Sequence, residues 1–134
     1  MIPFTVTLQP GVPLHEQVAF AARKAIVSKQ MLPGQPFPSV RALSTALKIN
    51  PNTAHKVIAA LTAEGLLEVH PGKGTLVTEG RSASRTQRAE WLHRELEMLT
   101  VEAKQLGLTL AEVQSALAAH WLRLERHAAK GRTS

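Results

Sequence analysis

Apolar residues recur at helical spacing in three segments of the first half of the chain, residues 13–29, 40–47 and 51–64. The inner positions, in chain order, are Leu14, Val18, Ala22, Ala25 and Ile26, then Val40, Leu43 and Leu47, then Ala54, Val57, Ile58 and Leu61. Apolar side chains at steps of three and four line one side of an α-helix. The pattern therefore predicts three helices, each with one side toward a shared core.

The boundaries of the second and third helices carry their own signals. Ser39 stands where an N-cap is needed, and Asn50 caps the next helix, with Pro51 at its first position. Gly65 fits the left-handed position just past the end of that helix. Because the connection between the two helices is only a few residues long, the segment predicts a helix-turn-helix.

A β-hairpin is expected directly behind the third helix. Residues 67–70 alternate between apolar and polar, residues 71–74 read Pro-Gly-Lys-Gly, and residues 75–78 are again rich in strand-forming side chains. Helices followed by such a hairpin make a winged helix. The short apolar stretch at residues 2–8 fits a strand as well, although short runs are ambiguous.

The pattern changes after residue 79. Residues 80–84 are small and polar and predict a linker, and a helix is expected from Arg85. Thr109 and Glu112 form a capping box for a last helix that ends near Ala129, before a frayed tail. We therefore expect a mainly α (α+β) protein with a winged helix-turn-helix at 1–79, a linker at 80–84 and a two-helix region at 85–130.

Both C-terminal helices carry an apolar face, which is the candidate for dimerisation. On the first, a seam with heptad-like spacing consists of Leu92, Leu96, Leu99, Ala103 and Leu106, and on the last, one side consists of Val113, Leu117, Trp121 and Leu124. Two helices of this size cannot bury such a face alone, so the partner is either the winged domain or a second copy. Heptad seams usually mark association between helices, which favours dimerisation through this region.

Composition narrows the function. The 134 residues hold 16 Lys and Arg against 10 acidic residues, all of them Glu, and no Cys. Missing Asp and Cys exclude an Asp-containing catalytic triad, thiol nucleophiles and zinc fingers. The formal charge of +6 favours a polyanionic partner such as nucleic acid. No signal peptide or membrane span is expected, which suits a cytoplasmic protein.

Candidate DNA-reading side chains gather at the start of the third helix. A recognition helix contacts base edges with its N-terminal residues. Asn52 suits adenine, Thr53 a phosphate or a thymine methyl, His55 a purine acceptor and Lys56 a phosphate, with Asn50 at the cap. The alternative is that Asn52 and Thr53 only cap and solvate the helix.

Further candidates lie on the preceding helix and the expected wing. Ser39 and Arg41 begin the helix that crosses the DNA backbone, and the alternative for Arg41 is a surface ion pair with Glu64 or Glu68. Lys73 and Gly74 lie at the wing tip, where glycine permits close approach to a groove and a cation can enter it. The alternative there is an ordinary solvated turn.

Local motifs from Leu14 to Glu79 together resemble the DNA-binding domain of the GntR family of bacterial transcription regulators. The motifs are Leu32-Pro33-Gly34 with Pro38-Ser39-Val40-Arg41-Ala42-Leu43, then Ile49 to Lys56, Leu61 to Leu67, and Gly72-Lys73-Gly74-Thr75-Leu76-Val77. Leu76 replaces the aromatic residue of the family's wing. Pro51 and His55 stand where many members carry Arg.

The short C-terminal region and the Asn-Pro-Asn-Thr start of the third helix resemble the YtrA-type subfamily. The resemblance implies a homodimer that represses transcription at a palindromic operator, often in operons of membrane transporters. A small-molecule effector between the dimerisation helices stays an open expectation. No cofactor is expected, and no catalytic residue.

One other function competes with this one, and one further kind of site is an alternative for the tail. A winged helix can serve as a protein-interaction module without specific DNA binding, since a fold does not determine a function. A metal site in the tail would need His93 and Glu97 with His120 and His127, but surface or packed histidines are much commoner, so no metal site is expected.

Overall fold

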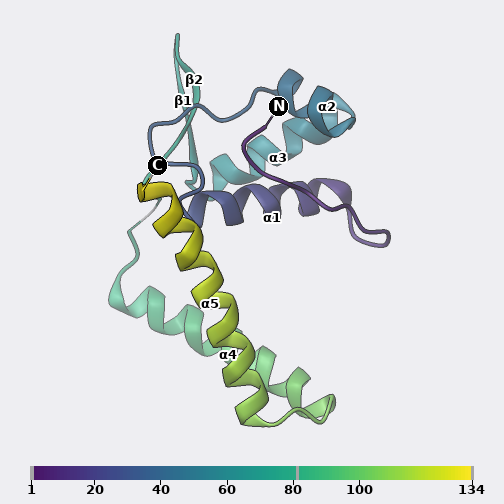
Figure 1. Ribbon diagram of the computed structural model, residues 1–134, viewed down its shortest axis with the longest axis vertical. Coiled ribbons are helices and arrows are strands. Elements are labelled where there is room, and N and C mark those ends of the chain that lie inside the picture. Colours follow the sequence, from purple (N-terminus) through teal and green to yellow (C-terminus); the bar gives the residue numbers. More distant parts are fainter. Residues whose placement is uncertain (1, 81, 134) are drawn as a thin grey trace. The chain divides into compact units, whose positions relative to one another are not determined.

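The structure is a computed structural model that describes residues 2–80 and 82–133, with side chains described as far as Glu125. The chain divides into two compact units: residues 1–81 make up most of the first, the winged unit, and residues 82–123 make up the second, the helical tail (Figure 1). The elements of the winged unit are α1 (Leu14–Val27), α2 (Val40–Leu47), α3 (Pro51–Ala63), β1 (Leu67–His70) and β2 (Gly74–Val77). The winged helix-turn-helix predicted from the sequence is confirmed.

The helix caps form as the sequence predicts. The Ser39 hydroxyl accepts a hydrogen bond from the Ala42 N–H at 3.1 Å. The Asn50 side chain accepts one from the Asn52 N–H at 2.8 Å, with Pro51 as the first residue of α3. These bonds satisfy N–H groups that have no partner within the helix, so α2 and α3 begin at fixed residues.

The core of the winged unit lies between the inner faces of its three helices, with α1 and α2 both packed on α3. The predicted inner positions of α1, α2 and α3 are all buried or half-buried. Leu43 and Leu61 are fully buried, and burial of such side chains stabilises the fold by about 1.5–3 kcal/mol each.

The stretch at residues 2–8 is not a strand, although that was one of the two interpretations left open. Its extended backbone has no strand beside it, and Phe4 is instead buried in the core. The Phe4 ring stacks on Phe37 with a centroid distance of 6.1 Å. Packing of Phe4, together with Ile2 and Val6 against the core, holds this segment without strand pairing.

The hairpin is antiparallel, with Leu67 opposite Val77 and His70 opposite Gly74. Its base is anchored in the core by Leu67 and Val77, whereas its turn projects beyond the helices of the winged unit (Figure 1). Residues 34–37 run beside β2: the Phe37 N–H donates to the Thr75 carbonyl at 2.8 Å, and the Gly34 N–H to that of Val77. Three neighbouring backbone segments therefore fix the direction of the wing.

The helical tail contains α4 (Arg85–Gln105) and the first part of α5 (Leu110–Thr133). The Thr109–Glu112 capping box forms as predicted, with distances of 2.8 and 3.1 Å. A second capping box joins Ser84 and Gln87, so Ser84, placed in the linker by the sequence pattern, already belongs to the start of α4. α5 continues to Thr133, past the predicted end near Ala129.

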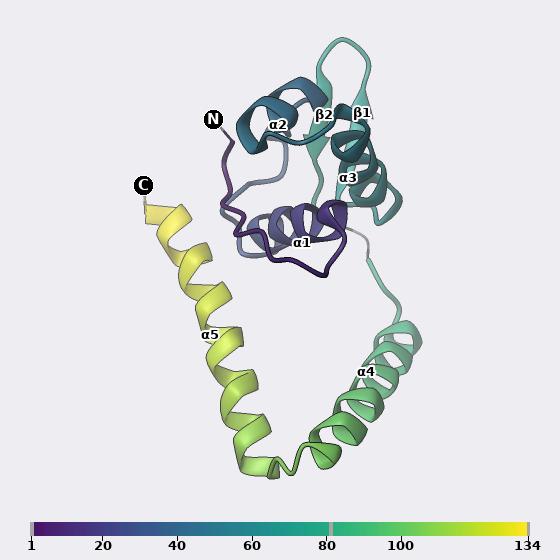
Figure 2. The same cartoon turned by 90° about the vertical axis from the view of Figure 1, so that its right-hand side faces the viewer.

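α4 and α5 diverge from the turn that joins them (Figure 2). Ala103, close to this turn, is buried, and the Leu108 N–H donates to its carbonyl at 3.0 Å. Away from the turn, large apolar side chains remain exposed along both helices. Within the described chain, no helix is both long and apolar enough to cross a membrane.

Candidate nucleic-acid interface

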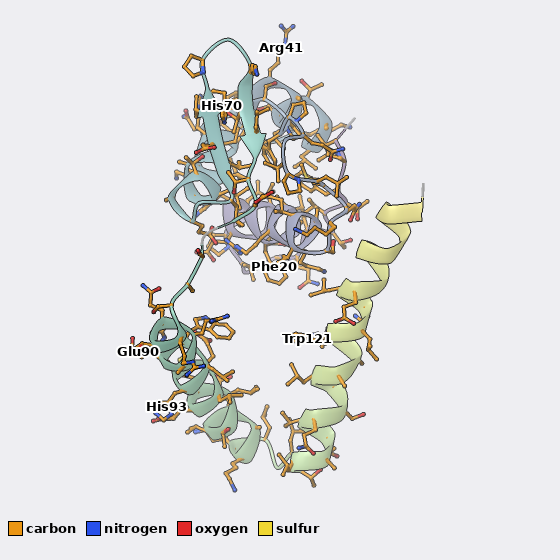
Figure 3. All side chains as sticks on the ribbon, turned by 90° about the vertical axis from the view of Figure 1, so that its left-hand side faces the viewer. Phe20, Arg41, His70, Glu90, His93 and Trp121 are labelled. Atoms are coloured by element: carbon orange, nitrogen blue, oxygen red, sulfur yellow. The ribbon has the colours of Figure 1, made fainter. Side chains whose placement is uncertain are left out.

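Arg41 lies on the first turn of α2, at the same end of the winged unit as the hairpin turn (Figure 3). Phe20, on α1, lies at the opposite end and points away from it. The capping bond of Ser39 uses its hydroxyl oxygen as an acceptor and leaves the O–H available as a donor. The start of α2 therefore presents one cation and one hydroxyl donor to solvent.

In the structure, Arg41 forms neither of the two ion pairs that the sequence leaves open, with Glu64 or with Glu68. Glu64 is bound by Arg23 through two contacts of 2.7 Å, and Glu68 lies 3.1 Å from His70. Across residues 2–80, Arg41 has no hydrogen bond or ion pair. Its guanidinium is exposed and ready to bind an anion.

The predicted reading residues share the first turns of α3. Asn52, His55 and Lys56 are exposed, and Thr53 is half-buried. The cap occupies the Asn50 side-chain oxygen and leaves its amide N–H groups as donors. None of these five side chains donates to another group of the described protein. The start of α3 is therefore a cluster of unsatisfied donors beside the helix N-terminus, whose partial positive charge also favours anions.

The wing tip is a tight turn in which the Lys73 N–H donates to the His70 carbonyl at 2.9 Å. Gly72 and Gly74 have φ values of 82° and 87°, a region that disfavours side chains, while a Cβ at either residue would meet open space. Backbone geometry, rather than internal crowding, requires these glycines. The exposed Lys73 side chain between them is free to follow a groove.

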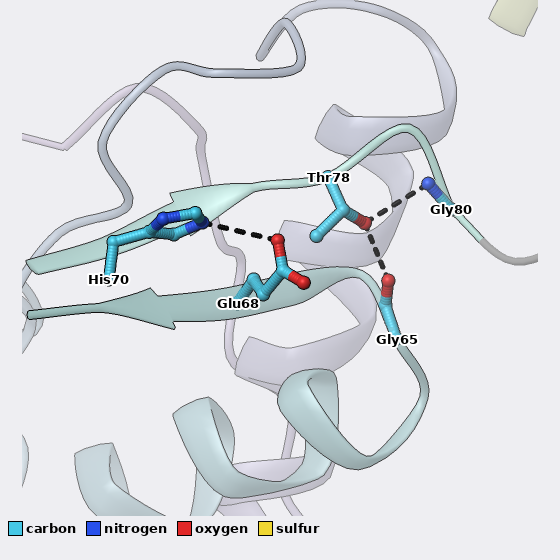
Figure 4. A network of polar contacts seen from close by, with 5 residues as sticks. All are labelled: Gly65, Glu68, His70, Thr78 and Gly80. Carbon is cyan, nitrogen blue, oxygen red and sulfur yellow. Dashed lines mark hydrogen bonds and ion pairs between the residues drawn. The ribbon is translucent and has the colours of Figure 1, made fainter.

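Polar contacts at the base of the wing join β2 to the end of α3 (Figure 4). The Thr78 hydroxyl donates to the Gly65 carbonyl at 2.5 Å and accepts from the Gly80 N–H at 3.0 Å. On the neighbouring strand, His70 Nε2 and Glu68 Oε2 lie within hydrogen-bond distance of each other, at 3.1 Å. The Thr78 contacts fix the wing against the helix that carries the predicted reading residues.

Charge is distributed unevenly over the winged unit. Residues 39–63, which cover α2 and α3, include Arg41, Lys48 and Lys56 and no acidic residue. The acidic side chains of the unit lie outside this segment. The helix-turn-helix is thus purely cationic, as a surface that approaches DNA phosphates requires.

Lys48 is a residue that the motif analysis missed. It lies in the turn between α2 and α3, with an exposed side chain and a left-handed backbone at φ 55°. Its position two residues before the α3 cap was a signal that the sequence did contain. The bidentate Arg23–Glu64 pair, in contrast, joins residues 41 positions apart and leaves no local signal.

The predicted dimerisation seam is largely uncovered within this chain. Leu92, Leu96 and Leu99 are 50%, 44% and 43% exposed, and Leu106, Leu117 and Trp121 are exposed as well. Val113 and Leu124 are half-buried, and Ala103 is buried near the turn. The tail therefore presents an apolar face that its own two helices do not cover.

The histidines of the tail do not assemble a metal site among the side chains that the structure describes, which include no metal-binding group of three or more ligands. His93 lies 3.3 Å from Glu97, one turn away on α4. The side chain of His127 lies outside the described residues.

Comparison with known proteins agrees with this architecture. The sequence profile of "Bacterial regulatory proteins, gntR family" matches residues 14–77. The uncharacterized HTH-type transcriptional regulator YhcF of Bacillus subtilis is 30% identical over 105 residues, which cover 78% of this chain and 87% of that protein. The HTH-type transcriptional repressor YtrA of Bacillus subtilis is 29% identical over 102 residues, 75% of this chain and 78% of its own.

Solved structures share the fold. A transcriptional antiterminator from Listeria monocytogenes EGD-e superposes with a TM-score of 0.78 at 21% identity, over 91% of this chain and 92% of that one. YtrA from Sulfolobus acidocaldarius, a GntR-family transcription factor, superposes with a TM-score of 0.54 at 25% identity, over 69% of this chain and 96% of its own. The relatives are regulators and not enzymes. The chain therefore belongs to the GntR family and is a DNA-binding transcriptional regulator.

Proposed function

We propose that this regulator is a homodimeric repressor that binds a palindromic operator in the promoter of its own operon. One observation carries the proposal: the Lys and Arg side chains of α2, α3 and the wing form no ion pair within residues 2–80, and α2 and α3 contain no acidic residue. The proposed DNA-binding surface consists of Ser39, Arg41, Asn50, Asn52, Thr53, His55, Lys56, Lys73 and Gly74.

Base reading is assigned to the exposed side chains at the start of α3. In the major groove, the Asn52 amide pairs with the N6 and N7 atoms of adenine, and His55 donates to a purine acceptor. Thr53 contacts a phosphate or a thymine methyl. Because Pro51 and His55 replace arginines that are common in the family, these weaker donors define the preferred site.

Phosphate binding positions the helix. Arg41 at the start of α2 and Lys56 on α3 bind the backbone on the two sides of the groove, and Ser39 and Asn50 add neutral donors. Lys73 at the wing tip enters the adjacent minor groove, where the neighbouring glycines permit close approach. These contacts give affinity and register rather than sequence preference.

The tail brings in a second winged unit, which binds the second half-site. A second copy covers the exposed leucines of α4 and α5, since a seam with heptad spacing packs best against another helix. The two winged units then meet half-sites about 34–36 Å apart or a multiple of that spacing, one DNA turn on the same face. Linking two modules raises affinity without any new contact.

Repression follows from occupation of the promoter. The Bacillus subtilis relative YtrA is named as a transcriptional repressor, which supports this direction of regulation. The proposal places the regulator in the cytoplasm, with transporter genes as targets within its operon. A small-molecule effector that binds between the tail helices would change operator affinity, and titration of the complex with candidate metabolites tests this part.

A footprinting experiment tests the proposal. The full chain is incubated with the promoter region of its own operon and with random DNA of equal length, and protection should cover two inverted half-sites. The logarithm of the binding constant should fall with the logarithm of salt concentration with a slope of about −0.9 per phosphate neutralised. A protein-interaction module would show neither protection nor this slope.

A further inference from the structure

The backbone of Lys48 occupies a conformation that glycine adopts more easily. Its φ and ψ are 55° and 48°, in the left-handed helical region, and its N–H donates to the Ser44 carbonyl as the C-cap of α2. A left-handed residue with a Cβ is strained, and helices usually end with glycine at such a position. A lysine at this position therefore makes the folded backbone less stable than a glycine would.

Within the described part of the winged unit, the Lys48 side chain makes no polar contact that would offset this strain. It is exposed and has no hydrogen bond or ion pair there. Helix dipoles do not explain it either: the C-terminus of α2 attracts the charge, but the N-terminus of α3 begins only a few residues later and repels it. The two effects oppose each other.

Lys48 lies in the turn just before α3, the helix that the proposed function places in the DNA groove. It precedes the Asn50 cap by two residues, in the turn between α2 and α3 (Figure 1). We propose that Lys48 is an additional DNA contact, which binds a backbone phosphate at the rim of the major groove next to the α3 N-terminus. This inference rests on the proposed DNA-binding function and adds a residue to its surface.

Lys29 provides an internal comparison. It also has a left-handed backbone, with φ 64°, just past the C-cap of α1. It follows the C-terminus of α1, where a cation is favourable, the next helix begins only at Val40, and its side chain is half-buried. The helix dipole therefore accounts for a lysine at 29 and does not account for one at 48.

The test compares Lys48→Gly, Lys48→Gln and Lys29→Gly in the whole 134-residue chain, on operator DNA and on random DNA over a salt series. Lys48→Gly relieves the backbone, so its thermal midpoint should be no lower than that of the native chain. Both Lys48 variants should bind operator and random DNA more weakly by a similar factor, about threefold to tenfold, and lose about one unit of salt slope per half-site. Lys29→Gly should keep affinity and slope.

Three results would overturn the assignment: an unchanged salt slope in both Lys48 variants, a loss confined to operator DNA, or an equal loss in Lys29→Gly. Because Lys48→Gln retains the strained backbone and Lys48→Gly removes it, a loss in one of them alone would indicate a conformational effect and would also reject a phosphate contact. A native chain that binds no DNA would reject the proposed function itself, whereas native binding with unaltered Lys48 variants rejects only this inference.

Discussion

Arg23 on α1 and Glu64 at the C-terminus of α3 form a two-point ion pair, with Nε–Oε1 and Nη2–Oε2 distances of 2.7 Å. The pair joins the first and last helices of the three-helix core. It also occupies the carboxylate that the sequence leaves open as a partner for Arg41. Arg41 itself forms no ion pair across residues 2–80, so its charge stays available for an anion.

Replacement of Glu64 tests whether its carboxylate contributes to stability alone or also to DNA binding. The side chains of Arg23 and Glu64 are 36% and 39% exposed, so water screens the pair and its contribution to stability is at most about 1 kcal/mol. We expect Glu64→Gln to lower the free energy of unfolding by less than that and to leave operator affinity unchanged. Urea unfolding and a DNA titration measure the two quantities.

Glu90, exposed on α4 and without a hydrogen bond or ion pair among the described residues, is the matched control. Glu90→Gln makes the same change of charge and should not alter the unfolding free energy of the winged unit. A large gain in DNA affinity with Glu64→Gln, but not with Glu90→Gln, would mean that Glu64 acts on the DNA-binding surface after all.

Arg41→Gln should weaken operator binding by about 1–3 kcal/mol and leave the fold and the dimer intact. The reason is that its guanidinium is exposed and unpaired in this chain, so its loss removes only an interaction with DNA. Fluorescence anisotropy with labelled operator measures the change, and circular dichroism checks the fold.

The control for Arg41 is Lys24→Gln. Lys24 lies with its ammonium 5.7 Å from the centre of the Phe20 ring, and Phe20 is at the end of the winged unit opposite to Arg41 (Figure 3). The two variants lose the same charge. Equal losses of affinity would show that net charge alone drives binding and would remove Arg41 from the site.

Local signals in the sequence predicted the elements of this fold, because caps and periodic apolar faces act over a few residues. Ser39, Asn50 and Thr109 cap their helices as expected. Contacts between distant segments were not predictable in the same way. The stacking of Phe4 on Phe37 depends on where the core leaves room, and a short apolar stretch does not reveal that its backbone has no strand to pair with.

The candidate site shows the same difference between local signals and contacts of distant segments. The exposure of Asn52, His55 and Lys56 follows from the helical period, which turns Ala54 and Val57 inward. The unpaired state of Arg41 does not follow from it, since that depends on which cations lie near Glu64 and Glu68 in space. The left-handed backbone of Lys48 is likewise a result of how α2 meets α3.

Thr78→Val should lower the free energy of unfolding by about 1 kcal/mol. The change keeps the shape of the side chain but removes a hydroxyl that donates to the Gly65 carbonyl and accepts from the Gly80 N–H (Figure 4). An intramolecular hydrogen bond contributes about 0.5–1.5 kcal/mol net, and its partner would lose a donor in a half-buried place. Urea unfolding of the full chain measures the change.

Thr75 on β2 is the control for Thr78, since its hydroxyl makes no hydrogen bond within residues 2–80. Thr75→Val should leave stability the same or raise it slightly, because valine suits a strand. If both valine variants have the same stability, the contacts of the Thr78 hydroxyl do not hold the wing.

Leu96→Glu should dissociate the proposed dimer, whereas Val101→Glu should leave it intact. Both residues are exposed apolar side chains on α4, 44% and 54% in this chain, but Leu96 lies in the heptad seam and Val101 lies about half a helical turn away from it. A charge within a packed seam would be buried without a partner, while the same charge on the outer face stays in water. Analytical ultracentrifugation measures the oligomeric state, and the binding curve on a two-half-site operator reports the loss of linkage between modules.

A Leu96→Glu chain that remains dimeric would place the interface on another surface. Dissociation by both variants would show that helix stability rather than the seam controls assembly.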